Sequence, residues 1–385
     1  MNTDASTSSE PDESVSPAGD PVVPAAPLEP SPLPEPTPSP EPEPTATPEP
    51  EPAQVYPPSF GFIDAHADTI SRALLYGHVI RSLYDSDFLH VDFKRLSEYD
   101  APVQVFAAWL PDFFVPEAFD VTNFLFDFFE EEVEKHSDII EIAHDLDDIR
   151  RIAGEGKISA ILAIEGGEAL EGKIENLEHF YNRGVRILTL AWNRENELGH
   201  GLYSSLSGGL KPFGFEVIKK MEELGMIMDV SHLNEAGFWD AHKTSTRPYI
   251  ASHSNSYSIM QHPRNLNDEQ ITAIVESGGI IGFNMYPTFI GPGEIIVVDD
   301  IFAHLHHFIQ IGAGDHIGLG CDYDGITSTP VGLKGVQTLK WLGEMLAEEF
   351  DEETSHKILE RNFYEFFKRY FESRYNPSAS NRYVS

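Results

Sequence analysis

The chain has 385 residues and a formal net charge of −37 at pH 7, from 63 Asp and Glu against 26 Lys and Arg. So strong a negative charge argues against nucleic acid or an anionic membrane as a partner, because both carry negative charges that would repel it. The single cysteine, Cys321, excludes an internal disulfide and any zinc site built on several thiolates.

The first 55 residues differ in composition from the rest of the chain. They hold 16 of the 28 prolines and 11 acidic residues, and they contain no Lys or Arg. Such a segment has too few large apolar side chains to offset its conformational entropy by burial. We therefore predict a disordered, acidic, Pro/Glu-rich stalk over 1–55 and one folded domain over 56–385.

The N-terminus lacks the basic and apolar regions of a signal peptide, and no later run is long or apolar enough to span a bilayer. As written, the sequence predicts a soluble protein without a targeting signal, which would be cytoplasmic. The alternative is a surface-tethered form, because a Pro/Glu-rich stalk also suits an enzyme whose signal or lipid anchor is missing from this sequence.

Directly after the stalk, the segment 62–68 carries a His-x-Asp pair, His66 and Asp68. Side chains two apart on a strand point to the same side, so an extended backbone would aim both at one point. Imidazole and carboxylate together suit zinc or a similar divalent ion, whereas a surface or capping pair is the alternative. The pair is a candidate half of a metal site.

Short apolar runs recur along the rest of the chain with helix-like segments between them. Runs of this kind fit strands that are buried on both faces, as in a parallel sheet. The pattern predicts an α/β fold, a (β/α)8 TIM-type barrel; an open doubly wound sheet competes but lacks its Gly-x-Gly-x-x-Gly turn. The predicted strands are 61–65, 103–110, 159–164, 186–191, 226–230, 248–251, 279–284 and 316–320, and the clearest predicted helices are 213–224, 268–277, 299–311, 333–349 and 352–371.

Two polar clusters on predicted helices are interpreted as solvated helix surfaces. One is the acidic run from Glu130 to Glu134. The other comprises His304, His306 and His307, which cannot all lie on one face of a helix.

Polar side chains stand where the functional groups of a barrel are expected, at the carboxyl ends of the strands. Each of them alone has a simpler explanation as a hydrogen-bonded loop residue. Together they predict a metal centre at one rim of the barrel. They are His66 and Asp68 after the first predicted strand, Glu165 after the third, His232 after the fifth, His253 after the sixth and Asp322 after the eighth.

The number of candidate ligands fits two ions better than one. A catalytic zinc typically takes three protein ligands and leaves a position open for water, whereas five ligands with one bridging carboxylate would serve two ions. Two adjacent ions would lower the pKa of a bridging water and polarise a carbonyl oxygen. The expected reaction is hydrolysis of an acyl bond by a bridging hydroxide, and no Gly-x-Ser-x-Gly elbow is present for a serine nucleophile.

Five segments contain these residues in order, namely 64–68, 164–167, 229–232, 251–255 and 320–325, and a sixth segment, 262–266, contains Arg264. With this order and spacing the chain resembles the membrane (renal) dipeptidase family of zinc metallopeptidases, family M19, over essentially all of 60–370. The resemblance implies a barrel that binds two Zn²⁺ ions and hydrolyses free dipeptides, including some with a C-terminal D-residue.

The resemblance also implies a role for each residue. His66 and Asp68 would hold one zinc, His232 and His253 the other, and Glu165 would bridge them and take part in catalysis. Arg264 matches the family's substrate-binding arginine, whose fixed fork suits a carboxylate or a developing oxyanion. Asp322 matches the acidic residue that binds the substrate's amino group or passes a proton to the leaving amine. The alternatives for Arg264 and Asp322 are a surface ion pair and a helix cap.

The chain departs from the vertebrate family at Trp192, which stands where those enzymes carry a substrate-contacting histidine. Asn193 or His200 would have to replace that contact, or water would, so we expect an altered substrate preference more than a loss of activity.

The sequence therefore predicts a zinc-dependent dipeptidase whose partners are small dipeptides, with a homodimer as an open question. One alternative is another dinuclear amidohydrolase, a lactonase or deacylase. The other is a non-catalytic surface-displayed binding protein, which the complete set of five metal ligands disfavours.

Overall fold

Residues 60–75, 82–205 and 208–373 are described by the computed structural model. The predicted stalk over 1–55 lies outside these residues, so the division into a stalk and a folded domain stays a prediction. Among the described residues, every helix is too short or too polar to cross a membrane.

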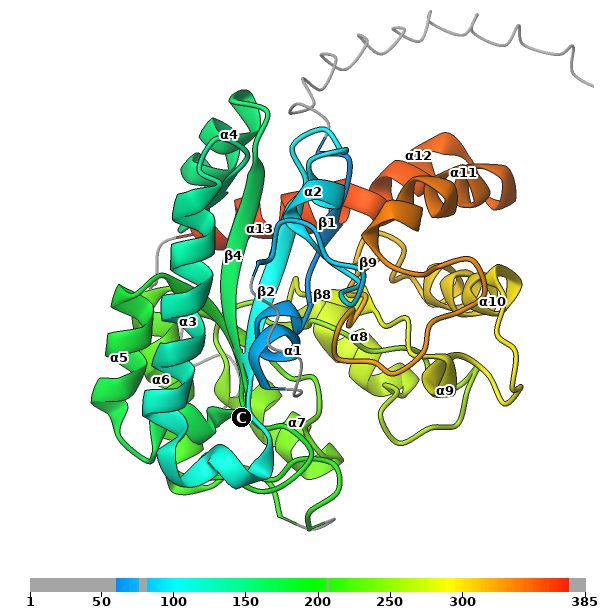
Figure 1. The fold of residues 1–385 in the computed structure, drawn as a ribbon. Coiled ribbons are helices and arrows are strands. Elements are labelled where there is room, and N and C mark those ends of the chain that lie inside the picture. Colours follow the sequence, from blue (N-terminus) through cyan, green and yellow to red (C-terminus); the bar gives the residue numbers. More distant parts are fainter. Residues whose placement is uncertain (1–59, 76–81, 206–207, 374–385) are drawn as a thin grey trace, which may run out of the picture. The chain divides into compact units, whose positions relative to one another are not determined.

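Nine strands of the described residues form one parallel sheet, and eight of them close into a barrel (Figure 1). The first strand, β1 (Ile63–Asp64), pairs with both β2 (Val103–Trp109) and the last strand, β9 (Ile317–Leu319). Because β2 also pairs along its length with β4 (Ile158–Glu165), the ring is complete and the open-sheet alternative is wrong. The remaining barrel strands are β5 (Val185–Thr189), β6 (Ile227–Asp229), β7 (Ile250–Ala251) and β8 (Ile280–Phe283). All eight predicted strands are confirmed.

The ninth strand, β3 (Ile140–Ile142), was not predicted. It pairs with Ile158–Ala160, the first part of β4, while β5 pairs with the later part of β4. A strand has only two edges, and β2 occupies the other one. Therefore β3 and β5 share one edge of β4, and β3 lies outside the ring.

The predicted helices are confirmed, with two changes. The helix predicted over 333–349 begins only at Leu339, after a 3-10 turn over Val336–Thr338, and the last helix is divided. Helix α6 (Pro212–Leu224) ends at Gly225, whose φ of 82° is one that glycine adopts without strain. Helix α8 (Asp268–Glu276) begins with a capping box, and α10 (Val298–Gln310) follows β8. The last predicted helix is interrupted by a π-helical turn, so that 352–371 contains α12 (Glu352–His356) and α13 (Asn362–Glu372). The other helices are α1 (Thr69–Leu75), α2 (Phe93–Leu96), α3 (Ala118–Lys135), α4 (Leu146–Gly154), α5 (Ile174–Asn182), α7 (Glu235–Thr244), α9 (Pro287–Ile290) and α11 (Leu339–Glu349).

Side-chain alternation along the strands separates two apolar clusters. On β4, Leu162 and Ile164 belong to the cluster that the strands share with the surrounding helices. Ile161 and Ala163 belong to a second cluster, which joins most of the barrel strands to Phe363 and Phe367 of α13. Glu165 follows Ala163 by two positions, so it shares the face of the inner cluster and points into the carboxyl end of the barrel.

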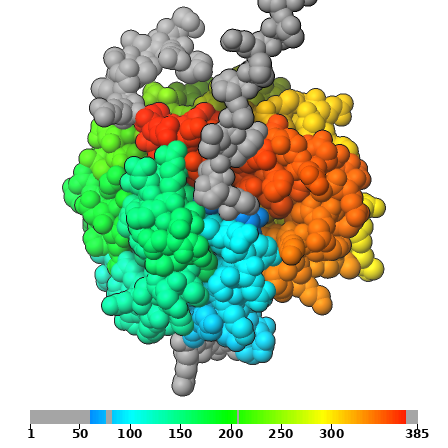
Figure 2. Space-filling view, turned by 90° about the horizontal axis from the view of Figure 1, so that it is seen from above, coloured from blue at the N-terminus to red at the C-terminus, as the bar shows by residue number. Residues whose placement is uncertain are grey.

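Helix α13 closes the opposite end of the barrel. Figure 2 looks onto this end and shows α13, in red, beside the orange α11 and α12. The ring of Tyr364 on α13 stacks on that of Phe60, which precedes β1, with the ring centroids 5.1 Å apart. The hydroxyl of Tyr364 accepts a hydrogen bond from Arg150 of α4. The amino-terminal end of the barrel is thus filled by aromatic side chains, and the carboxyl-terminal end is left for the polar groups.

The interpretation of two polar clusters as solvated surfaces is wrong for one residue in each. His304 is fully buried on α10, where its two ring nitrogens contact the backbone N–H of Ser256 and the carbonyl of Ile290. Glu132 is buried on α3 and accepts a hydrogen bond from the backbone N–H of Leu83. Each is a buried polar group paired with the backbone, which periodicity alone does not reveal.

Candidate active site

The structure brings the six predicted strand-end residues together at the carboxyl end of the barrel. Glu165 is the last residue of β4, and the other five lie within four residues of the ends of β1, β6, β7 and β9. Their side chains are largely withdrawn from solvent. The six are His66, Asp68, Glu165, His232, His253 and Asp322.

The backbone is strained at two of these positions. His232 and Asp322 have φ angles of 69° and 59°, in the left-handed region that residues other than glycine seldom adopt. Such conformations persist only where the surroundings enforce them, and they cluster at functional sites. Both strained residues lie close to other members of the cluster, His232 to Glu165 and Asp322 to His66 and Asp68.

Glu165 lies at the centre of the cluster. Its Oε1 lies 2.9 Å from Nε2 of His232 and 3.4 Å from Nε2 of His253, and its Oε2 lies 3.7 Å from Nε2 of His66. Asp68 Oδ2 in turn lies 3.4 Å from His66 Nε2. Potential ligand atoms group within 4.8 Å in two sets, one of His66, Glu165 and His253 and one of His66, Asp68 and Asp322.

Hydrogen bonds indicate which ring nitrogen carries the proton in His232 and in His253. The Ser252 hydroxyl donates to Asp229 over 2.6 Å, so it must accept from Nδ1 of His253, 2.7 Å away. Nδ1 of His232 faces the Oδ1 acceptor of Asn193 at 3.0 Å. Both Nδ1 atoms are therefore protonated, and both Nε2 atoms, only 2.8 Å apart, present lone pairs. Two nitrogen lone pairs that face one another and the carboxyl group of Glu165 fit a shared cation.

The pKa values of these residues also favour a bound cation. Burial raises the pKa of Glu165 to about 8, with Asp68 adding to the effect, and burial lowers the pKa of His232 and His253 well below the ordinary histidine value. Burial also lowers the pKa of His66, but the carboxylates of Glu165 and Asp68 outweigh it and the net pKa lies well above that value. Burial thus disfavours the charged form of Glu165 and keeps His232 and His253 neutral, and a divalent cation would stabilise the carboxylate and bind the neutral imidazoles. The residues present therefore fit a metal centre.

Asp229 supports the candidate site through hydrogen bonds; the sequence analysis quoted it in a motif but gave it no role. It is fully buried and accepts four hydrogen bonds, from the backbone N–H groups of Ser231 and Ser252 and from the hydroxyls of Ser252 and Thr189. Through Ser252 it fixes the ring of His253, and through Ser231 the turn that carries His232. Such partners orient metal ligands and set their basicity.

We expect Asp229→Asn to weaken metal binding by about 10–100-fold, because the amide can no longer accept all of these bonds and His253 loses its fixed tautomer. Competition with a chromogenic chelator measures the affinity directly, independent of activity. Asp299→Asn, at an exposed position on α10, is the matched control and should bind metal as the wild type does. Equal affinity in the two variants would show that Asp229 does not support the ligands.

Asp322 can lie close to the candidate metal ligands because the residue three positions later is Gly325. A Cβ at Gly325 would lie 2.1 Å from Asp68 Oδ2 and 2.5 Å from Asp322 Oδ1, so only glycine fits between the two carboxylates. Asn284 donates to the other oxygen of Asp322 over 2.9 Å. Burial raises the pKa of Asp322 to about 7. The residue is therefore held beside the ligands with one oxygen turned toward them.

Arg264 is buried beside His253. Its guanidinium donates to the carbonyl of His253 over 3.1 Å and to the hydroxyl of Ser254 over 3.3 Å, and it lies over the ring of Phe289. Its Nε is buried and has no hydrogen-bond partner among the described residues. A surface ion pair does not fit this buried placement, so that simpler alternative for Arg264 is wrong. A buried guanidinium with an unused donor is suited to an anionic ligand.

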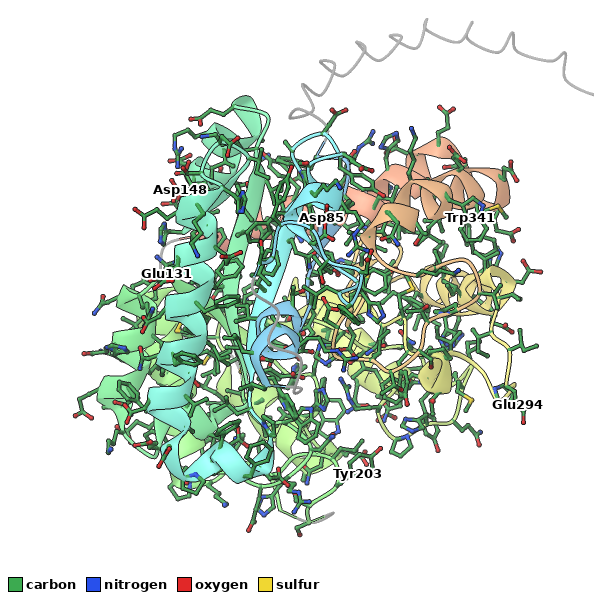
Figure 3. All side chains as sticks on the ribbon, viewed as in Figure 1. Asp85, Glu131, Asp148, Tyr203, Glu294 and Trp341 are labelled. Atoms are coloured by element: carbon green, nitrogen blue, oxygen red, sulfur yellow. The ribbon has the colours of Figure 1, made fainter. Side chains whose placement is uncertain are left out.

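A cavity of about 370 Å³ opens beside these residues and is lined by Asp68, Glu165, His232, Arg264 and Asp322. Its volume lies at the lower end of the roughly 300–1,000 Å³ typical of small-molecule sites. Trp192 and Asn193 also line it. Figure 3 places Tyr203, a further lining residue, at the end of the barrel away from Asp148 of α4. The cavity therefore opens at the carboxyl ends of the strands.

Asn193 and His200 were proposed to replace the histidine contact that this chain lacks at Trp192. The two residues differ in their positions relative to the cavity. Asn193 lies in the cavity wall and also holds His232, as described above. His200 instead contacts the carbonyl of Gly209 over 2.9 Å and the carboxylate of Glu195 over 3.1 Å, and it does not line this cavity within the described part of the chain. Of the two, only Asn193 is in place to meet a ligand.

A second carboxylate on the same side of the barrel, Glu168, gives a stability prediction. Burial raises its pKa to about 7 from 4.5, although a hydrogen bond from Asn196 opposes the shift. A raised carboxyl pKa favours the folded state at low pH and costs stability as the pH rises through 7. We expect Glu168→Gln to raise the free energy of unfolding by roughly 2 kcal/mol at pH 8, with a much smaller gain at pH 5. Chemical denaturation at the two pH values tests this, and an equal gain at both would contradict it.

Taken together, the closed α/β barrel and the imidazole and carboxylate groups converging at its carboxyl end are those of a metal-dependent barrel hydrolase. Residues 58–378 match the model of the membrane dipeptidase family, peptidase family M19. The chain belongs to this family, and it is a metallopeptidase of the dipeptidase type.

Individual relatives agree with this assignment. An uncharacterized dipeptidase of Schizosaccharomyces pombe is 31% identical over 271 residues, which cover 64% of each protein. The crystal structure of a metallopeptidase from Rhodobacter sphaeroides, liganded with a phosphinate mimic of the dipeptide L-Ala-D-Ala, is 25% identical with a TM-score of 0.74, covering 81% of this chain and 99% of that one. The dipeptidase AC, an M19 metallopeptidase, is 26% identical with a TM-score of 0.75, covering 82% and 100%.

Proposed function

We propose that the protein is a zinc dipeptidase that binds two ions bridged by Glu165 and hydrolyses free dipeptides. The observation that carries the proposal is the geometry around Glu165, where the unprotonated nitrogens of His232 and His253 meet its carboxylate. On this proposal His232 and His253 hold one ion, and His66 and Asp68 hold the other. Histidine nitrogen and carboxylate oxygen without thiolate are the donor set of catalytic zinc sites.

When bound, the ions would activate a water molecule near neutral pH and polarise the scissile carbonyl. The protein side chains bind and orient the substrate. Arg264, with its unused Nε, would hold the substrate carboxylate, and Asp322 would hold the amino group and deliver a proton to the leaving amine. Arg264 and Asp322 line the same cavity of about 370 Å³. A ligand that carries a carboxylate and an amino group close together is therefore favoured.

A relative bears on the proposed stereochemistry of the substrate. The Rhodobacter sphaeroides enzyme was crystallised with a mimic of L-Ala-D-Ala. We extend this to the present chain and propose that dipeptides with a C-terminal D-residue are also accepted. The homodimer stays a prediction.

The decisive experiment measures hydrolysis of L,L- and L,D-dipeptides and of their N-acetylated forms, first with metal stripped and then with zinc restored. We expect activity on the free dipeptides that depends on zinc and is lost on acetylation. Zinc-dependent cleavage of acetylated substrates would instead support a deacylase, and a zinc-loaded protein that cleaves none of them would refute the proposal.

A substitution at Arg264 tests the carboxylate contact. Arg264→Lys keeps the charge but loses the planar fork, so we expect the preference for a dipeptide acid over its C-terminal amide to fall at least tenfold. The measurement is kcat/KM for one acid and amide pair in both proteins. Arg361→Lys, at an exposed pair with Glu353, is the control and should leave the preference unchanged. A preference that survives in Arg264→Lys would assign the carboxylate to another group.

A further inference from the structure

The cavity wall differs in character from its floor. Beyond Asp68, Glu165, His232, Arg264 and Asp322, the described residues that line the cavity include no Asp, Glu, Lys or Arg. Five of the eleven remaining lining residues are Trp, Tyr or Phe, namely Trp109, Trp192, Tyr203, Tyr286 and Phe289. The polar residues among the others include Asn193, Thr288 and Thr327, which carry no charge. A titratable wall residue, His262, is biased toward its neutral form because burial lowers its pKa. The wall therefore offers apolar surface and no ionic partner for a substrate side chain.

Most of these aromatic residues form two groups, which come from different sides of the barrel. Trp192, which follows β5, packs edge-on against Trp109 at the end of β2, with centroids 4.8 Å apart, and its ring lies 6.1 Å from that of His232. Phe289, which follows β8, packs on Tyr286 at 4.9 Å and on His262 at 4.6 Å, and carries the guanidinium of Arg264 at 5.7 Å. Both groups thus reach the candidate catalytic residues directly.

We propose that this wall selects dipeptides with uncharged, apolar side chains, and that Trp192 is the specificity-determining residue. The inference rests on the proposed function, since it assumes that the cavity binds dipeptides. A charged side chain packed against these rings would lose hydration without gaining a partner, whereas an apolar one would gain from burial. A histidine at this position would offer an additional polar atom to the substrate. Trp192 presents an apolar face instead.

The test is a matched series of dipeptides, Ala-Xaa and Xaa-Ala, in which Xaa is Leu, Phe, Asp or Lys. We expect kcat/KM for Leu and Phe to exceed that for Asp and Lys by roughly 10–100-fold in at least one series. Trp192→His should reduce this ratio at least fivefold, and Trp192→Phe should keep it. Trp341→His is the matched control, because Trp341 lies on α11 and Figure 3 shows it far from Tyr203 at the cavity.

Each outcome separates this inference from the proposed function. Zinc-dependent cleavage of apolar and charged dipeptides at rates within threefold of each other would overturn the selectivity and leave the dipeptidase standing. A strong preference that persists in Trp192→His would overturn the role of Trp192. No cleavage of any dipeptide by the zinc-loaded wild type would refute the proposed function itself. The readout is the ratio of kcat/KM between apolar and charged dipeptides. A smaller fraction of active protein in one variant lowers both values equally and leaves this ratio unchanged.

Discussion

Replacing Glu165 with glutamine is expected to lower kcat/KM on free dipeptides by on the order of 10³-fold or more, equivalent to about 4 kcal/mol of transition-state stabilisation. The amide keeps the shape of the side chain but removes the negative charge that faces His66, His232 and His253. If Glu165 bridges two ions, the same change should reduce the bound zinc from two ions per chain to one or none. Metal analysis of the gel-filtered protein measures this loss alongside the kinetics.

The control is Glu168→Gln, three residues further along the chain. It neutralises a neighbouring buried carboxylate that does not line the cavity within the described residues, and it should keep both zinc and activity. The metal-free form of Glu165→Gln should be at least as stable as the metal-free wild type, because burial raises the pKa of Glu165 to about 8 and the amide removes the cost of burying that carboxyl group. Full zinc content in Glu165→Gln would mean that the remaining ligands suffice and that Glu165 is no bridge.

Replacing Asp322 with asparagine should lower kcat by 10²–10⁴-fold, the usual contribution of a positioned acid or base. The zinc content should stay unchanged, because on our proposal Asp322 meets the substrate and not the ions. The variant should also lose the wild-type preference for a free amino group over an N-acetylated one. Kinetics on the paired substrates and metal analysis together test the assignment.

The competing role for Asp322 is that of a metal ligand, since its carboxylate lies within 4.8 Å of the ligand atoms of His66 and Asp68. Loss of zinc in Asp322→Asn, with the amine preference intact, would establish that role and refute the one proposed. Asp315→Asn serves as the control, because Asp315 is exposed and pairs only with Lys357 in the described interactions.

The barrel could be predicted from the sequence because its strands are buried on both faces. Each such strand is a continuous apolar run, and the ring follows from eight runs separated by helices. Strand β3 could not be predicted, since Ile140–Ile142 is three residues long with a glutamate in the middle. Its conformation comes from pairing with β4, and that pairing is a tertiary contact.

The candidate metal ligands could be predicted because strand ends and residue types identify them. The hydrogen bonds that support these ligands could not be predicted, because they depend on the register between neighbouring strands. Asp229 meets the hydroxyl of Thr189 because these two residues are register partners on β6 and β5. It also reaches Ser252 because it is the register partner of Ile250, near the end of β7. The role of Asn193 toward His232 is hidden for the same reason.

The interior of the barrel is completed by the last helix, and this has a consequence for how the protein is made. The ring cannot close until β9 is available to pair with β1, and the inner cluster lacks Phe363 and Phe367 until α13 is present. More than 250 residues separate β1 from β9, and loop closure over such a distance is slow and entropically costly. During synthesis, the early strands must therefore leave the ribosome with one face uncovered. We expect the nascent chain to rely on chaperones until β9 and α13 have emerged.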